Sequence, residues 1–140
     1  MSNKLFIVSS MLIGLSACQT IPAEDTPDIA INGTWLIEAV QGEAVIDYSP
    51  AQLVFAEDGK LSGNNSCNQF FGQYKLDGQQ LELLPAGSTM KACVDALMNQ
   101  EQRVMQAMVL VTQADESKGK LLLKDVDGNI QLTLTKSSAE

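Results

Sequence analysis

Short segments in which apolar and polar residues alternate cover most of the chain from residue 33 onward. Trp35, Ile37 and Ala39 share one face of the first segment, and Leu53 and Phe55 share one face of the second. Such alternation predicts half-buried strands of an antiparallel sheet. Further segments of this kind span residues 60–63, 70–76, 81–83, 121–124 and 130–135.

One later segment has a helical pattern instead. Residues 95–112 contain no Gly or Pro, and an apolar row at helical spacing consists of Leu97, Val104, Met108 and Val111. Asp95 or Asn99 is expected to cap this helix. About seven or eight short strands with one helix predict a mainly β (α+β) fold, in which an antiparallel sheet curls into an open barrel and the helix covers the open side.

The N-terminal segment has the pattern of an export signal. Lys4 precedes an apolar run that is too short to span a bilayer. The run ends in Leu15-Ser16-Ala17-Cys18, which resembles the lipobox of bacterial lipoproteins. We therefore expect residues 1–17 to be a signal peptide, Cys18 to carry lipid, and residues 18–32 to form a tether before a domain at 33–136. The alternatives are a core helix ending at a free thiol and an ordinary secretory signal.

Acylation of Cys18 would leave an even pair of cysteines, Cys67 and Cys93, in an oxidising compartment. A disulfide between them would stabilise the fold by about 3.5 kcal/mol on the chain-entropy estimate. Two buried reduced thiols are the alternative.

Charge and composition exclude several classes of function. The chain has 140 residues with a formal net charge of −8 and no basic stripe, so it would repel nucleic acid. It contains no histidine, which excludes the usual Ser-His-Asp, Cys-His and His-metal sites. We expect no catalytic residue, no metal and no cofactor.

A calcium loop is the nearest metal motif. Asp125, Asp127 and Asn129 match its first alternating ligands, but Gly128 comes too early and Lys136 replaces the final bidentate acid. The segment is better explained as a hairpin turn.

The most informative residues lie between 63 and 101, and together with Trp35 they resemble the META domain (HslJ) family. The matching positions are Trp35, Gly63, Cys67, Asn68, Phe70, Gly72, Tyr74, Thr89, Met90, Ala92, Cys93 and Glu101. The family's leucine after the tryptophan is filled here by Ile37. The resemblance implies a mainly β envelope domain, often lipid-anchored and associated with heat or antibiotic stress, without an established enzymatic activity. It also favours a structural disulfide.

Two features of the helical segment have competing interpretations. Glu101 lies in the apolar row, where it is either a recognition or acid/base carboxylate or a structural acceptor; the structural role is the simpler one. Four methionines, Met90, Met98, Met105 and Met108, suggest either an adaptable binding face or core packing, and core is the more frequent outcome.

The sequence supports a non-enzymatic lipoprotein that aids stress tolerance through protein or envelope contacts. Gln19 after the lipidated cysteine favours the outer membrane, with the domain facing the periplasm. The second hypothesis is a periplasmic inhibitor or ligand-binding module, for which Gln113–Lys120 is the candidate acidic loop. A hydrolase using only carboxylates is a distant third, because no acid pair can be placed.

Overall fold

The computed structural model describes residues 28–138. The predicted signal peptide, the lipid-bearing Cys18 and the tether up to residue 27 lie outside these residues. Within residues 28–138, the helix is neither long nor apolar enough to cross a bilayer.

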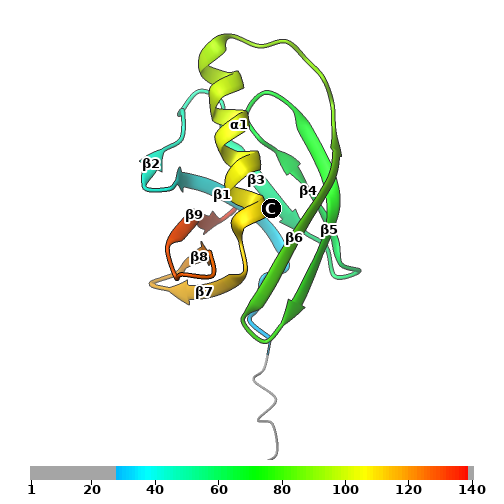
Figure 1. The fold of residues 1–140 in the computed structure, drawn as a ribbon, viewed down its shortest axis with the longest axis vertical. Coiled ribbons are helices and arrows are strands. Elements are labelled where there is room, and N and C mark those ends of the chain that lie inside the picture. The colour runs from blue at the N-terminus through cyan, green and yellow to red at the C-terminus, as the bar shows by residue number, and fades with distance from the viewer. Residues whose placement is uncertain (1–27, 139–140) are drawn as a thin grey trace, which may run out of the picture.

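The described residues form one antiparallel sheet of nine strands and one helix (Figure 1). The strands are β1 (Gly33–Val40), β2 (Glu43–Ala44), β3 (Ala51–Phe55), β4 (Lys60–Asn64), β5 (Gln69–Asp77), β6 (Gln80–Ser88), β7 (Gln113–Ser117), β8 (Lys120–Lys124) and β9 (Ile130–Lys136). The helix α1 (Asp95–Leu110) connects β6 to β7. The predicted fold class is confirmed.

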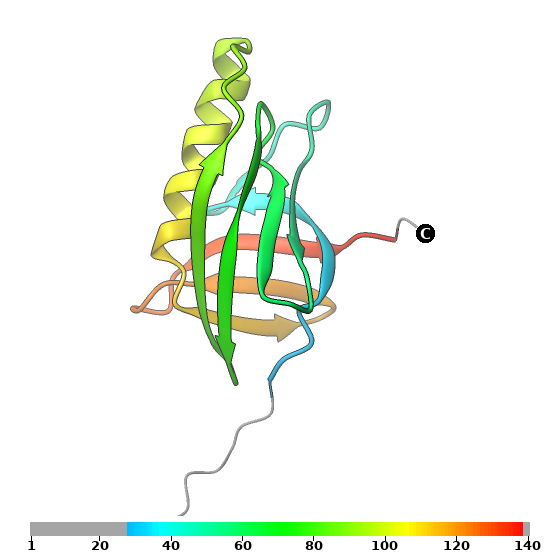
Figure 2. The ribbon, with the colours of Figure 1, turned by 90° about the vertical axis from the view of Figure 1, so that its right-hand side faces the viewer.

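The sheet closes on itself because β1 pairs with both β3 and β9. Its weakest joint is between β6 and β7, where the ladder has one residue pair, Gln80 with Gln113. The helix α1 lies alongside β6 at this joint (Figure 2). Val104, Ala107 and Met108 on α1 are buried there, so the helix completes the core where backbone pairing is minimal.

One apolar cluster fills the inside of the curled sheet. Its fully buried members from the strands include Ile37, Leu53, Phe55, Leu61, Leu81, Leu121, Leu123, Leu132 and Leu134. These residues come from the alternating positions of the strands, so the sequence pattern predicts the core.

The structure corrects three expectations. The N-cap of α1 is Val94, without a side-chain cap, instead of Asp95 or Asn99. Residues 113–117, expected to be part of an acidic loop, form strand β7, which has little apolar alternation. Residues 28–32 belong to the domain and not to the tether, because Ile31 is buried in the core. A local alternating pattern cannot show such a contact, since Ile31 packs against segments distant in sequence.

Trp35 is buried as predicted, with 4% of its surface exposed. Its indole Nε1 donates a 2.6 Å hydrogen bond to the carbonyl of Ile31. The Lys136 ammonium lies 4.6 Å from the centroid of its ring. Phe55 and Tyr74, in the same core cluster, contact each other edge to face at 5.1 Å. Trp35 therefore holds the first residues of the domain against the closed sheet.

Replacing Trp35 with Ala should lower the free energy of unfolding by about 3–5 kcal/mol, because it leaves a large cavity and an unpaired Ile31 carbonyl. Urea unfolding followed by circular dichroism measures the change. Tyr48→Ala, at a position 73% exposed, is the matched aromatic control and should change stability little. A loss below about 1 kcal/mol for Trp35→Ala would contradict this role.

Candidate functional site

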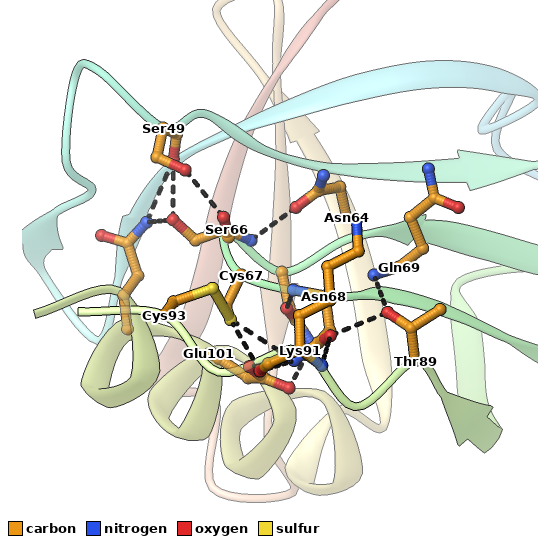
Figure 3. Close-up of a disulfide and its surroundings, with 12 residues drawn as sticks. Ser49, Asn64, Ser66, Cys67, Asn68, Gln69, Thr89, Lys91, Cys93 and Glu101 are labelled. Atoms are coloured by element: carbon orange, nitrogen blue, oxygen red, sulfur yellow. Dashed lines mark hydrogen bonds between the residues drawn. A yellow bond between two sulfur atoms is a disulfide. The ribbon is translucent and has the colours of Figure 1, made fainter. Parts of the chain in front are cut away.

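Three segments that carry the family-motif residues meet beside the first turns of the helix (Figure 3). They are the β4–β5 connection at residues 65–68, the segment at 89–93 that leads into the helix, and the first turns of α1. The structure thus brings together Cys67, Asn68, Thr89, Met90, Cys93 and Glu101, and places Trp35 and Tyr74 elsewhere in the core.

Asn68 is the centre of this region and is buried. Its Oδ1 accepts hydrogen bonds from Thr89 Oγ1 at 2.8 Å and from the Lys91 backbone N–H at 2.7 Å. Its Nδ2 donates to Glu101 Oε2 at 2.9 Å. Its backbone N–H donates to Asn65 Oδ1 at 2.8 Å. One amide therefore connects the strand connection, the segment before the helix and the helix.

Glu101 has a structural role in this network. Oε1 accepts from Asn65 Nδ2 at 3.2 Å, and Oε2 accepts from Asn68 Nδ2. Both oxygens of this half-buried carboxylate therefore have donors, which is what a carboxylate withdrawn from water requires. The geometry agrees with the simpler of the two interpretations of Glu101.

A second polar network is centred on Gln100, the helix residue before Glu101. The site predicted from the sequence did not include it. Gln100 is buried, and its Oε1 accepts from the Ile46 backbone N–H at 2.7 Å while its Nε2 donates to Ser66 Oγ at 2.9 Å. Ser49 and Ser66 exchange two side-chain-to-backbone hydrogen bonds. The sequence does contain a signal for the burial of Gln100. Its spacing from Leu97 and Val104 places it on the core face of the helix.

Cys67 and Cys93 form a disulfide with a Cα–Cα distance of 6.0 Å, as predicted. Cys67 precedes Asn68, and Cys93 lies immediately before the N-cap of the helix. The bond therefore joins covalently the same segments that Asn68 joins by hydrogen bonds.

The motif glycines are required by close packing. A Cβ atom at Gly63 would lie 2.1 Å from the Gln52 carbonyl oxygen and 2.7 Å from the Phe70 ring. A Cβ at Gly72 would lie 2.1 Å from the Leu84 carbonyl oxygen. Gly72 also sits at an irregularity of the β5–β6 ladder. These positions shape the curled sheet and leave Phe70 buried above Gly63.

Tyr74 forms hydrogen bonds that join β5 to residues after β3 and before β1. Its hydroxyl donates to the Ala56 carbonyl at 2.7 Å and lies 3.0 Å from Asn32 Oδ1. Burial raises the pKa of this phenol, and the nearby carboxylates of Asp58 and Glu57 raise it further. Tyr74 therefore stays neutral and acts in packing.

An open groove of about 660 Å³ lies between the 88–92 segment and α1. Met90 at its rim is 97% exposed, Met98 is exposed and Met105 is half-buried. Only Met108 is fully buried, so core packing was the wrong expectation for Met90 and Met98. Helical spacing did not predict this because Met98 lies on the groove side of α1 and Met90 precedes the helix.

The turn at residues 125–129 is a hairpin turn. Asp125 Oδ1 accepts from the backbone N–H groups of Asp127 and Asn129, and its Oδ2 accepts from Asn129 Nδ2 and Gln131 Nε2. The Asn129 bonds are the main reason that the pKa of Asp125 is lowered. No group of acidic or cysteine side chains within residues 28–138 is arranged to hold a metal ion.

Glu101→Gln should lower the free energy of unfolding by about 1–3 kcal/mol while keeping the fold. A glutamine has one acceptor oxygen, so its amino group would face a donor from Asn65 or Asn68. Chemical denaturation measures the effect, and Glu116→Gln on exposed β7 is the control. Equal stability of the two variants would show that the Glu101 bonds are not structural.

Removing the disulfide in a Cys67→Ser/Cys93→Ser variant should lower stability by about 3.5 kcal/mol, because the unfolded chain gains freedom. Thermal unfolding with and without a reductant measures it. The variant should be insensitive to reductant, and a wild-type protein equally insensitive would contradict a stabilising bond.

Comparisons with known proteins agree with this architecture. One similar solved structure is an NMR structure of a protein from Burkholderia xenovorans, with a TM-score of 0.60 and 23% identity, covering 77% of this chain and 83% of that one. A second NMR structure has a TM-score of 0.55 and 25% identity, covering 74% and 88%. No curated protein matches. The family model of the META domain matches residues 28–138, and the chain therefore belongs to the META domain family.

Proposed function

We propose that this protein is a non-enzymatic lipoprotein of the bacterial envelope that supports stress tolerance. Lipid on Cys18 holds it in the outer membrane, and the domain faces the periplasm. It contacts other proteins through the methionine-lined groove between the 88–92 segment and α1. Membership of the META domain family and the lipobox-like residues 15–18 support this assignment.

The polar groups around the motif support a non-enzymatic role. The side chains of Asn68, Thr89 and Glu101 are used in hydrogen bonds that hold segments together. Cys67 and Cys93 are bonded to each other, so neither sulfur is a nucleophile. The whole chain also lacks histidine, the usual acid/base group near neutral pH.

The exposure of Met90 is the observation that carries the proposal. Its neighbours Thr89 and Lys91 are fixed by Asn68, so the flexible thioether projects from a rigid segment. Met98 and Met105 on α1 line the same groove. Methionine-rich surfaces adapt to apolar partners, so an apolar polypeptide segment is the best-fitting occupant.

The position of the first residues of the domain supports the proposed attachment to the membrane. The Gly78 backbone N–H donates to Asp28 Oδ1 at 2.6 Å, which places the start of the domain at the β5–β6 turn. That turn and the beginning of α1 lie at opposite ends of the molecule (Figure 1). Residues 18–28 reach at most about 35 Å. A lipid on Cys18 would therefore attach at the end of the domain opposite the groove.

The inhibitor hypothesis loses its structural candidate. Residues 113–120 are strand β7 and a tight turn at Lys118 and Gly119, instead of a long acidic loop. No inhibitory loop is therefore proposed for this segment.

Cys18→Ser should abolish lipid attachment and leave unprocessed precursor. Metabolic labelling with a fatty-acid analogue, together with detergent-phase partition of the envelope fraction, measures this. Ala17→Gly, which keeps a small residue before the cysteine, is the control and should mature normally. Normal maturation of the Cys18→Ser variant would contradict the lipoprotein assignment.

A Met90→Asp/Met98→Asp variant should fold and localise normally but fail to restore stress tolerance to a deletion strain, because charge blocks an apolar partner. Val126→Asp, at an exposed apolar position in the β8–β9 turn, is the matched control and should restore it. Survival after heat or antibiotic challenge is measured alongside protein level. Full rescue by the methionine variant would contradict a role for the groove.

A further inference from the structure

Part of the outer face of β3, β4 and β5 has an unusual composition for this acidic chain. Opposed residues of the strand ladder form two rows across it. The first row is Leu36, Gln52, Asn64 and Gln69, and the second is Thr34, Val54, Ser62, Phe71 and Gly87. Neither row contains a charged residue, although the chain carries 17 acidic residues. These two rows are therefore neutral and polar, with one aromatic ring. The charged side chains on the same face, Lys60, Lys75 and Asp77, lie farther along β4 and β5, and Lys60 and Lys75 are paired with Asp58 and Glu82.

Phe71 is 61% exposed, and its ring packs against the neighbouring strand. A Cβ atom at Gly87 would lie 2.7 Å from Cζ of the Phe71 ring and 3.1 Å from Cε1. The ring therefore leans over the bare backbone of Gly87 on the neighbouring strand. Aromatic residues that cover a cross-strand glycine in this way are held in place by the sheet. The side of the ring away from Gly87 remains available to a ligand.

Amide side chains stand beside this ring with hydrogen-bonding capacity to spare. The side-chain amides of Gln52 and Gln69 are not used in hydrogen bonds within residues 28–138, and Asn64 uses only its Oδ1, which accepts from the Ser66 N–H at 2.7 Å. Figure 3 shows the amide groups of Asn64 and Gln69 on the side of the strands away from α1. A hollow of about 280 Å³ lies among Gln52, Ser62, Asn64 and Gln69.

We propose that this face binds a neutral oligosaccharide, with one sugar ring packed on Phe71 and its polar groups bonded to Gln52, Asn64 and Gln69. The C–H edges of a pyranose carry partial positive charge, which suits the negative face of an aromatic ring. Carboxamides offer both donors and acceptors, as hydroxyl and acetamido groups require. A neutral ligand leaves no charge to desolvate, which matches the absence of charged residues from the two rows.

A protein partner fits this face less well. The cores of protein interfaces combine several apolar or aromatic anchors with few unpaired polar groups. Here Phe71 on β5 and Leu36 on β1 are the large exposed apolar residues, and strands β3 and β4 lie between them. The hollow also shares no lining residue with the methionine-lined groove, so the two surfaces are independent.

The test is an NMR titration of the ¹⁵N-labelled full chain, purified in a detergent without a sugar headgroup. Chitotetraose, which carries acetamido groups, and cellotetraose, which does not, are the two probes. We expect shifts in the side-chain amide signals of Gln52, Asn64 and Gln69 and in the backbone signal of Phe71. A response to chitotetraose alone assigns the site to acetamido sugars, and a response to both assigns it to neutral glycans generally.

Variants locate the binding. Phe71→Ala should weaken binding about tenfold, because the stacking ring is removed. Gly87→Ala should weaken it severalfold by displacing the ring, whereas Tyr48→Ala, which removes an exposed aromatic elsewhere, should leave it unchanged. The proposal is overturned if neither sugar shifts these signals, if shifts map to the methionine-lined groove, or if Phe71→Ala binds as well as wild type. Binding of a purified envelope protein to this face, with no sugar response, would likewise overturn it.

Discussion

The side chain of Asn68 is the interaction on which the motif end of this molecule depends. One buried carboxamide accepts from Thr89 and from the Lys91 backbone, and donates to Glu101. An asparagine suits this position because it carries donors and acceptors on one short planar group. Aspartate would lack the donors and would face Glu101 as a like charge. The arrangement of the β4–β5 connection, the 89–93 segment and α1 therefore follows from this one residue.

The need for such an interaction arises from the weak joint of the sheet. Strands β6 and β7 share one ladder pair, so the helix must cover the gap between them. Apolar packing through Val104, Ala107 and Met108 holds the middle and the last turns of α1. Apolar packing alone is not directional, whereas the Glu101 and Gln100 bonds fix the register of the helix. The disulfide adds a covalent limit on how far these segments separate.

Rigidity at this end has a consequence for recognition. Because Met90 follows Thr89 and precedes Lys91, both held by Asn68, an adaptable side chain is presented from a fixed backbone. Phe71 is fixed in a different way, by the bare backbone of Gly87. The two surfaces differ in chemistry, one thioether-lined and one amide-lined. The two proposed contacts, with an apolar chain and with a neutral polar ligand, would therefore use separate surfaces.

The sequence by itself determined the strands with clean alternation, the extent of the helix and the cysteine pair. These features depend on periodicity and residue type, which are local properties. It did not indicate β7, whose residues Gln113–Ser117 alternate little, nor the burial of Ile31. The roles of Glu101, Gln100 and Met90 were also decided only by tertiary structure. Each depends on which distant segment lies opposite: Asn65 and Asn68 for Glu101, Ile46 and Ser66 for Gln100, and open solvent for Met90. Periodicity shows which face of an element a side chain occupies, but the partner on that face is set by how the sheet closes.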